Sequence, residues 1–88
     1  MKAKRIGMFS VPRDWIEEHP QEVVEMFFNL NMIVIRAEMM YHTMAIEYTA
    51  LSPVFDLCPI EHMVPLYHLI RIQLNNDEVT YKVEKINA

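Results

Sequence analysis

The most informative part of the sequence is EYTALSPVFDLCPIEHMVPLY, residues 47–67. It places Pro53, Pro59 and Pro65 between two patterns that are typical of β-strands. Because proline lacks an N–H and fixes φ, we expect this stretch to leave the sheet as a loop. It is also too rich in apolar residues for a solvated linker. An ordered loop of this length in a small domain is usually functional, so we look for a site here first.

A strand and a helix are predicted before this loop. Residues 5–11 (RIGMFSV) alternate as a strand, and we expect Pro12 to end it. Residues 13–19 predict about one helical turn, and Pro20 then suits the first position of a longer helix. Apolar residues follow at i, i+3, i+4 and i+7, which predicts one buried helix face that ends near residues 29–31. The residues of this face are Val23, Met26, Phe27 and Leu30.

Residues 32–41 and 44–51 alternate as strands and predict a β-hairpin. A two-residue turn between them would place Glu38 opposite Glu47, and like charges in that position are destabilising. A four-residue loop would instead place Arg36 opposite Glu47, which is favourable. The turn also has no Asn-Gly pair, so we expect the longer loop.

A second hairpin is predicted after the proline-rich stretch, from residues 66–74 and 79–86. The sequence NNDE between them is a common turn signal. With a four-residue turn, Ile70 would face Val83 on the apolar side of the hairpin. Arg71 would then point the other way, toward solvent.

These elements predict a single α+β domain spanning residues 1–88. We expect a mostly antiparallel sheet, made of two hairpins plus an N-terminal strand, with one main helix packed on it. The predicted order is β-α-ββ-loop-ββ. Apolar residues make up 52% of the chain and charged residues 23%, which is typical of a folded globular protein.

Composition excludes several classes of function. The net charge of −4 argues against a protein that binds a nucleic-acid duplex through its phosphates. The single glycine excludes P-loops and dinucleotide-binding loops, which need several glycines. No apolar run is long enough to span a membrane. A single cysteine, Cys58, cannot form an intrachain disulfide and suits a reducing cytoplasm.

Residues that could perform catalysis or bind metal are few. Cys58 and His62 have the spacing of half a metal site, but no second pair completes it. Ser52 or Cys58 could act as a nucleophile, but no glycine-containing nucleophile elbow surrounds either residue. We therefore predict no metal, no cofactor and no enzymatic activity, and a small enzyme or metal protein ranks third among the hypotheses.

Aromatic residues and arginines near the loop could bind a planar, phosphorylated ligand. Aromatic rings stack on bases, and arginine pairs with phosphate in a bidentate manner. The alternative is that the aromatic residues fill the core of a small domain. The ligand-binding candidates are Arg36, Tyr48, Ser52, Phe55, Tyr67 and Arg71.

Methionine is abundant, with eight in 88 residues. Met40 and Met44 fall at the tip of the first predicted hairpin, where burial within one chain is difficult. Methionine is enriched at protein interfaces. We therefore predict a homo-oligomer or a partner-binding surface at this tip.

One pattern of the central third resembles small accessory proteins encoded by tailed phages. Its elements are Glu47-Tyr48-Thr49-Ala50, Ser52-Pro53, Phe55-Asp56, Pro59 and Pro65-x-Tyr67. Among phage-encoded inhibitors of bacterial defence, the chain is similar to viral sponge proteins that sequester cyclic-nucleotide immune signals. The resemblance implies an oligomer with ligand pockets at subunit interfaces, acting without turnover in the cytoplasm of a bacterial host.

Two hypotheses for function follow. The first is a non-enzymatic phage-type binding protein that counters host defence by sequestering a cyclic di- or oligonucleotide in a homo-oligomer. The alternative is a protein-binding inhibitor or adaptor that docks on a host protein through an acidic, Met-rich surface. The sequence leaves the choice between them open.

Overall fold

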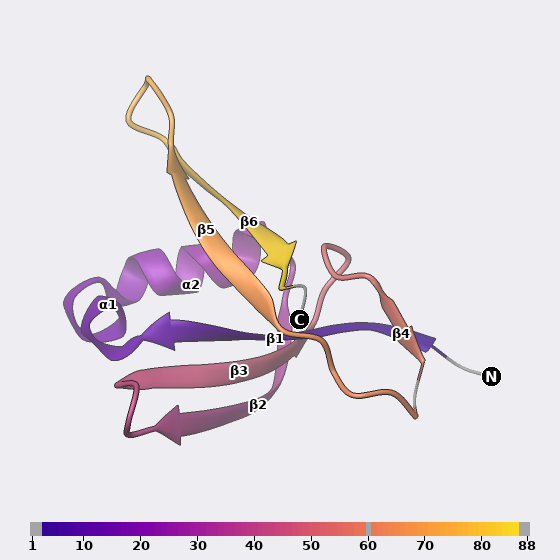
Figure 1. The fold of residues 1–88 in the computed structure, drawn as a ribbon. Helices are drawn as coiled ribbons and strands as arrows, with labels where there is room; N and C mark the ends of the chain where they lie inside the picture. The colour runs from indigo at the N-terminus through magenta and orange to yellow at the C-terminus, as the bar shows by residue number, and fades with distance from the viewer. Residues whose placement is uncertain (1–2, 60, 87–88) are drawn as a thin grey trace.

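The computed structural model describes residues 3–59 and 61–86 and confirms the predicted α+β class. The elements in chain order are β1 (Ala3–Pro12), α1 (Arg13–Glu18), α2 (Pro20–Asn29), β2 (Ile33–Met40), β3 (Ala45–Leu51), β4 (Leu57–Pro59), β5 (Tyr67–Gln73) and β6 (Val79–Lys85) (Figure 1). Within the described part of the chain, neither helix is long and apolar enough to cross a membrane.

The strands form two antiparallel sheets. The first has the order β2-β3-β1-β4, and the second is the β5-β6 hairpin. The hairpin begins beside β1, where the Met8 N–H donates to the Pro65 carbonyl at 2.9 Å. From there β5 and β6 lead away from the four-stranded sheet (Figure 1). The hairpin tip therefore stands apart from the body of the domain.

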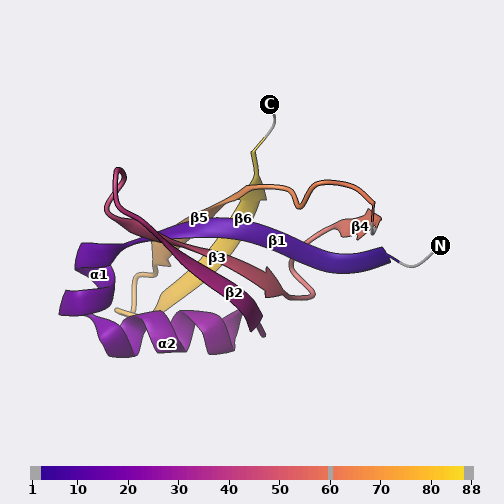
Figure 2. The same cartoon turned by 90° about the horizontal axis from the view of Figure 1, so that it is seen from below.

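Helix α2 covers one face of the four-stranded sheet (Figure 2). The predicted apolar face is confirmed, since Val23, Met26 and Leu30 are buried and Phe27 packs against them. The Phe27 ring meets Tyr48 on β3 edge to face, with ring centroids 5.1 Å apart. The core thus lies between α2 and the sheet.

Gly7 on β1 is where the proline-rich loop reaches the core. A Cβ built at Gly7 would lie 2.7 Å from the Phe55 ring and 2.8 Å from the Tyr67 ring. Both rings are buried, and their centroids are 4.6 Å apart. Only glycine permits this approach, so Gly7 allows the loop and the start of β5 to pack directly on the backbone of β1.

The expectation that the proline-rich stretch contains no strand is wrong. Leu57–Pro59 forms β4, which pairs antiparallel with residues 3–5 of β1. The strand has three residues, lies at the edge of the sheet and ends at Pro59. Proline is tolerated at the edge of a sheet, where one side of the strand has no ladder to break.

The predicted register of the first hairpin is also wrong. Glu38 lies opposite Glu47, and Arg36 lies opposite Thr49. The loop has four residues between Met40 and Ala45, but the chain turns by placing Met44 in the left-handed region, with φ of 52°. The repulsion is reduced because the pair is on the solvent side and Arg36 donates to Glu38 at 3.2 Å.

The second hairpin differs from its prediction by one residue. Leu69 lies opposite Val83, and Arg71 lies opposite Tyr81. Five residues, not four, separate the strands, because Asp77 adopts a left-handed φ of 65°. A shift of one residue exchanges the two faces of a hairpin. Arg71 was expected to point to solvent but turns toward α2 instead.

Replacing Gly7 by alanine tests the close approach. The added methyl group must displace the Phe55 or Tyr67 ring, so we expect Gly7→Ala to lower the free energy of unfolding by about 1–3 kcal/mol. Urea unfolding measures the change, with Ser10→Ala on the same strand as the control. An unchanged or raised stability would contradict the packing, since alanine is otherwise preferred to glycine in strands.

Candidate functional site

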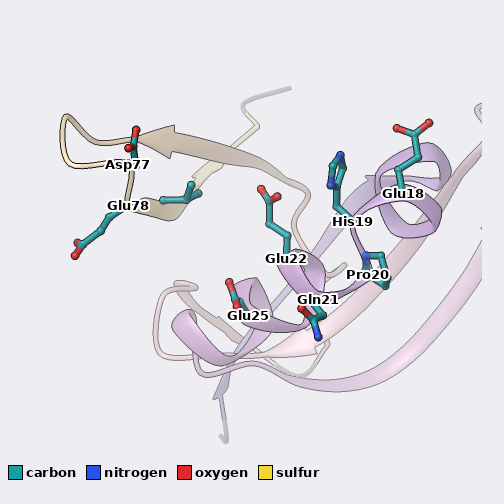
Figure 3. Close-up of a pocket in the computed structure, with 9 residues that line it drawn as sticks. Glu18, His19, Pro20, Gln21, Glu22, Glu25, Asp77 and Glu78 are labelled. Atoms are coloured by element: carbon teal, nitrogen blue, oxygen red, sulfur yellow. The ribbon is translucent and has the colours of Figure 1, made fainter.

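An acidic cleft of about 870 Å³ lies between α2 and the loop of the β5-β6 hairpin. Its lining residues are Glu18, His19, Pro20, Gln21, Glu22, Glu25, Asp77, Glu78 and Val79. Figure 3 shows Glu22 and Glu25 rising from α2, with Asp77 and Glu78 on the hairpin across from them. Acidic residues thus line both walls of the cleft, although the Glu78 side chain points away from α2.

The helix wall of the cleft follows from the local sequence. His19 separates α1 from α2, and its N–H donates to the Trp15 carbonyl at 2.8 Å. Pro20 then begins α2, and Glu22 lies in the first turn. Acidic residues are favourable there because the first N–H groups of a helix carry partial positive charge. Glu22 and Glu25 are three residues apart and share one face of the helix.

Arg71 and Tyr81 connect the hairpin to the helix through Glu22. The Arg71 guanidinium and the Tyr81 hydroxyl both donate to Oε1 of Glu22, the hydroxyl at 3.3 Å. The guanidinium holds the pKa of Glu22 below its ordinary value of 4.5. Burial, and then the charge of Glu22, raises the pKa of Tyr81 above its usual value of 10.0. Glu22 is therefore ionised at neutral pH, and its contacts with Arg71 and Tyr81 join the hairpin to α2.

The carboxylates of the cleft are spread along its walls. Over residues 3–59 and 61–86, no group of three or more His, Cys, Asp or Glu side chains is placed to hold a metal ion. Separate negative charges suit a partner that carries several positive charges at intervals.

Of the six predicted ligand residues, the two arginines lie in different parts of the fold. Arg36 is exposed on β2 and pairs with Glu38. Arg71 is on β5 and pairs with Glu22. Arg36 lines a small hollow on the solvent face of the sheet, and Arg71 lines a different hollow beside Trp15. The structure therefore does not bring the two guanidinium groups together.

The three predicted aromatic residues take part in the core. Phe55 is 0% exposed and packs on Tyr67, whose hydroxyl accepts from the Asp56 N–H at 3.0 Å. Tyr48 stacks on Phe9, with ring centroids 5.7 Å apart, and burial raises the pKa of its hydroxyl above 10.0. The structure therefore brings Phe55 and Tyr67 together, on the core side of the sheet.

Ser52, the sixth predicted residue, holds the end of α2 against the loop. Its buried hydroxyl donates to the Leu30 carbonyl and accepts from the Val54 N–H at 3.3 Å. The Leu30 carbonyl follows the last turn of α2, where helix carbonyls lack a partner within the helix. Ser52 supplies that partner, which gives the residue a structural role.

Sequence reasoning missed the acidic cleft. The spacing of Glu22 and Glu25 at i and i+3 was a signal for one acidic face of the predicted helix. The sequence carries no signal that Asp77 and Glu78 would lie opposite this face, since more than 50 residues separate the two walls of the cleft.

No significant match links the chain to a known protein family, a curated protein or a solved structure.

The Glu22 contact predicts a pH-dependent contribution to stability. A carboxylate whose pKa is lowered by folding stabilises the fold above its ordinary pKa of 4.5 and loses this effect as the pH falls through its folded pKa. We expect wild type to resist urea better than Glu22→Gln at pH 7, and the difference to shrink as the pH falls below 4.5. Glu61→Gln is the control. A difference that stays constant with pH would contradict the pairing.

Replacing Ser52 by alanine leaves the Leu30 carbonyl without its donor. A buried acceptor that loses its partner costs about 1–3 kcal/mol, so we expect Ser52→Ala to lower the free energy of unfolding by that amount. Chemical denaturation measures it, with the exposed Ser10→Ala as the matched control. Equal stability of the two variants would show that the buried bond does not form.

Proposed function

We propose that this protein is a non-enzymatic binding module that docks a basic segment of a partner protein in the acidic cleft. The observation that carries the proposal is that five acidic residues line one hollow, three on the helix side and two on the hairpin loop. The proposal modifies the inhibitor or adaptor hypothesis, which expected an acidic, Met-rich docking surface: the cleft is acidic, but no methionine among the described residues lines it.

The walls of the cleft suit lysine and arginine side chains. Arg71 neutralises Glu22, so the charge that a partner would meet comes from Glu18, Glu25, Asp77 and Glu78. Pro20 and Val79 add apolar surface between the charges. Lysine and arginine lay their aliphatic stems along apolar surface and keep their charged ends near carboxylates. An extended basic segment uses both features.

The cyclic-nucleotide hypothesis receives less support from the geometry. Phosphates would be repelled by the cleft, and the rings of Tyr48, Phe55 and Tyr67 already pack against other core rings. Sequestration of an immune signal, a phage origin, homo-oligomerisation and a cytoplasmic location in a bacterial host stay predictions. The Met-rich part of the surface is at the tip of the β2-β3 hairpin, where Met44 is exposed.

Two fluorescent probes test the proposal, an oligoarginine peptide and a cyclic dinucleotide. We expect the peptide to bind, with an affinity that falls as salt is added. The double variant Glu25→Gln/Glu78→Gln should weaken peptide binding by about fivefold or more. Fluorescence anisotropy gives both affinities.

The control variant Glu61→Gln/Glu84→Gln removes the same charge from exposed positions outside the cleft. It should keep most of the affinity for the peptide. Equal weakening by the two double variants would mean that net charge, and not the cleft, attracts the peptide. Binding of the cyclic dinucleotide in preference to the peptide would overturn the proposal in favour of the nucleotide hypothesis.

A further inference from the structure

Strand β2 is an open edge in the described structure. It lies outermost in the order β2-β3-β1-β4 and pairs with β3 along one side. Its residues 33–38 are exposed, and the exposed fractions of Ile33 and Ile35 are 65% and 53%. The opposite edge, β4, is protected because it has three residues and ends at a proline. Strand β2 is longer than β4, and after its bulge it contains no proline.

The charges on β2 are unbalanced within one chain. Glu38 lies opposite Glu47, and Arg36 is the cation that contacts Glu38, at 3.2 Å. Both side chains are more than half exposed, at 71% for Arg36 and 53% for Glu38. A second positive charge beside Glu38 would relieve the like-charge pair. The free side of β2 is where that charge can be supplied.

We propose that β2 pairs antiparallel with β2 of a second copy, about a twofold axis at Ala37. The two four-stranded sheets would then continue into one another across the joined edges. The occupant of this edge is thus a second copy of the chain. The proposal goes beyond the acidic cleft, whose lining residues belong to other elements.

Charge selects the register of this pairing. A twofold axis perpendicular to an antiparallel pair makes one residue lie opposite its own copy. With Arg36 or Glu38 at the axis, two like charges would face each other. With Ala37 at the axis, Arg36 of each copy lies opposite Glu38 of the other, which gives two favourable pairs. Ala37 is also small enough to lie beside its own copy.

Only a short part of β2 is regular enough for this pairing. The bulge between Val34 and Arg36 interrupts the strand, so a ladder symmetric about Ala37 has its regular pairs at residues 36–38. The twofold axis places both copies of α2 on the same face of the joined sheet, and Phe28 on that helix is 76% exposed. The ladder is short, so we expect a dimer that dissociates on dilution.

Charge reversal tests the register. Arg36→Glu gives four facing glutamates at the seam, and Glu38→Arg gives four facing arginines. We expect each variant alone to raise the dimer dissociation constant at least tenfold relative to wild type. An equimolar mixture of the two should recover the association, because every glutamate at the seam of one chain would then oppose an arginine of the other. Sedimentation velocity over a range of concentrations measures wild type, each variant and the mixture.

The double variant Arg36→Glu/Glu38→Arg restores complementarity within one chain and should dimerise as wild type does. Glu61→Arg is the control for charge reversal elsewhere, and circular dichroism checks that each variant is folded. The proposal is overturned if wild type stays monomeric up to millimolar concentration, or if the mixture does not recover association. The cleft variant Glu25→Gln/Glu78→Gln should dimerise normally, so failure of the dimer and failure of the cleft are distinguishable.

Discussion

The contact of the Phe55 and Tyr67 rings with the bare backbone at Gly7 is the constraint on which the rest of the structure depends. The rings take the space that a Cβ would occupy, at 2.7 and 2.8 Å from its position. Phe55 attaches the proline-rich loop to the core, and Tyr67 is the first residue of β5. The position of one glycine therefore determines where the loop closes and where the second hairpin starts.

The geometry of the cleft follows from this contact. The hairpin that begins at Tyr67 carries Arg71 and Tyr81 to Glu22 on α2. The Trp15 ring lies 6.1 Å from the Tyr81 ring, which adds an apolar contact near the same pair. Beyond these contacts the loop with Asp77 and Glu78 forms the far wall. The position of the acidic cleft thus depends on the buried packing of Phe55 and Tyr67 at the start of the hairpin.

Periodicity and proline placement were enough to predict the helices and every strand except β4, but not how the strands pair. The start of α2 at Pro20 and its buried face agree with the prediction, because both depend on local sequence. Both hairpin registers were wrong, because Met44 and Asp77 adopt left-handed conformations for which glycine would have been the usual signal. The acidic cleft was missed since its walls come from opposite ends of the chain, and three aromatic ligand candidates lie in the core.

The most direct test of this account is an NMR measurement on the only glycine of the chain. Labelling with isotopic glycine gives one backbone signal, which needs no further assignment. We expect the Gly7 Hα protons to show nuclear Overhauser contacts to the ring protons of Phe55 and Tyr67, with chemical shifts displaced by the ring currents. Hα shifts near their random-coil values, without contacts to either ring, would contradict the packing that positions the hairpin and its cleft.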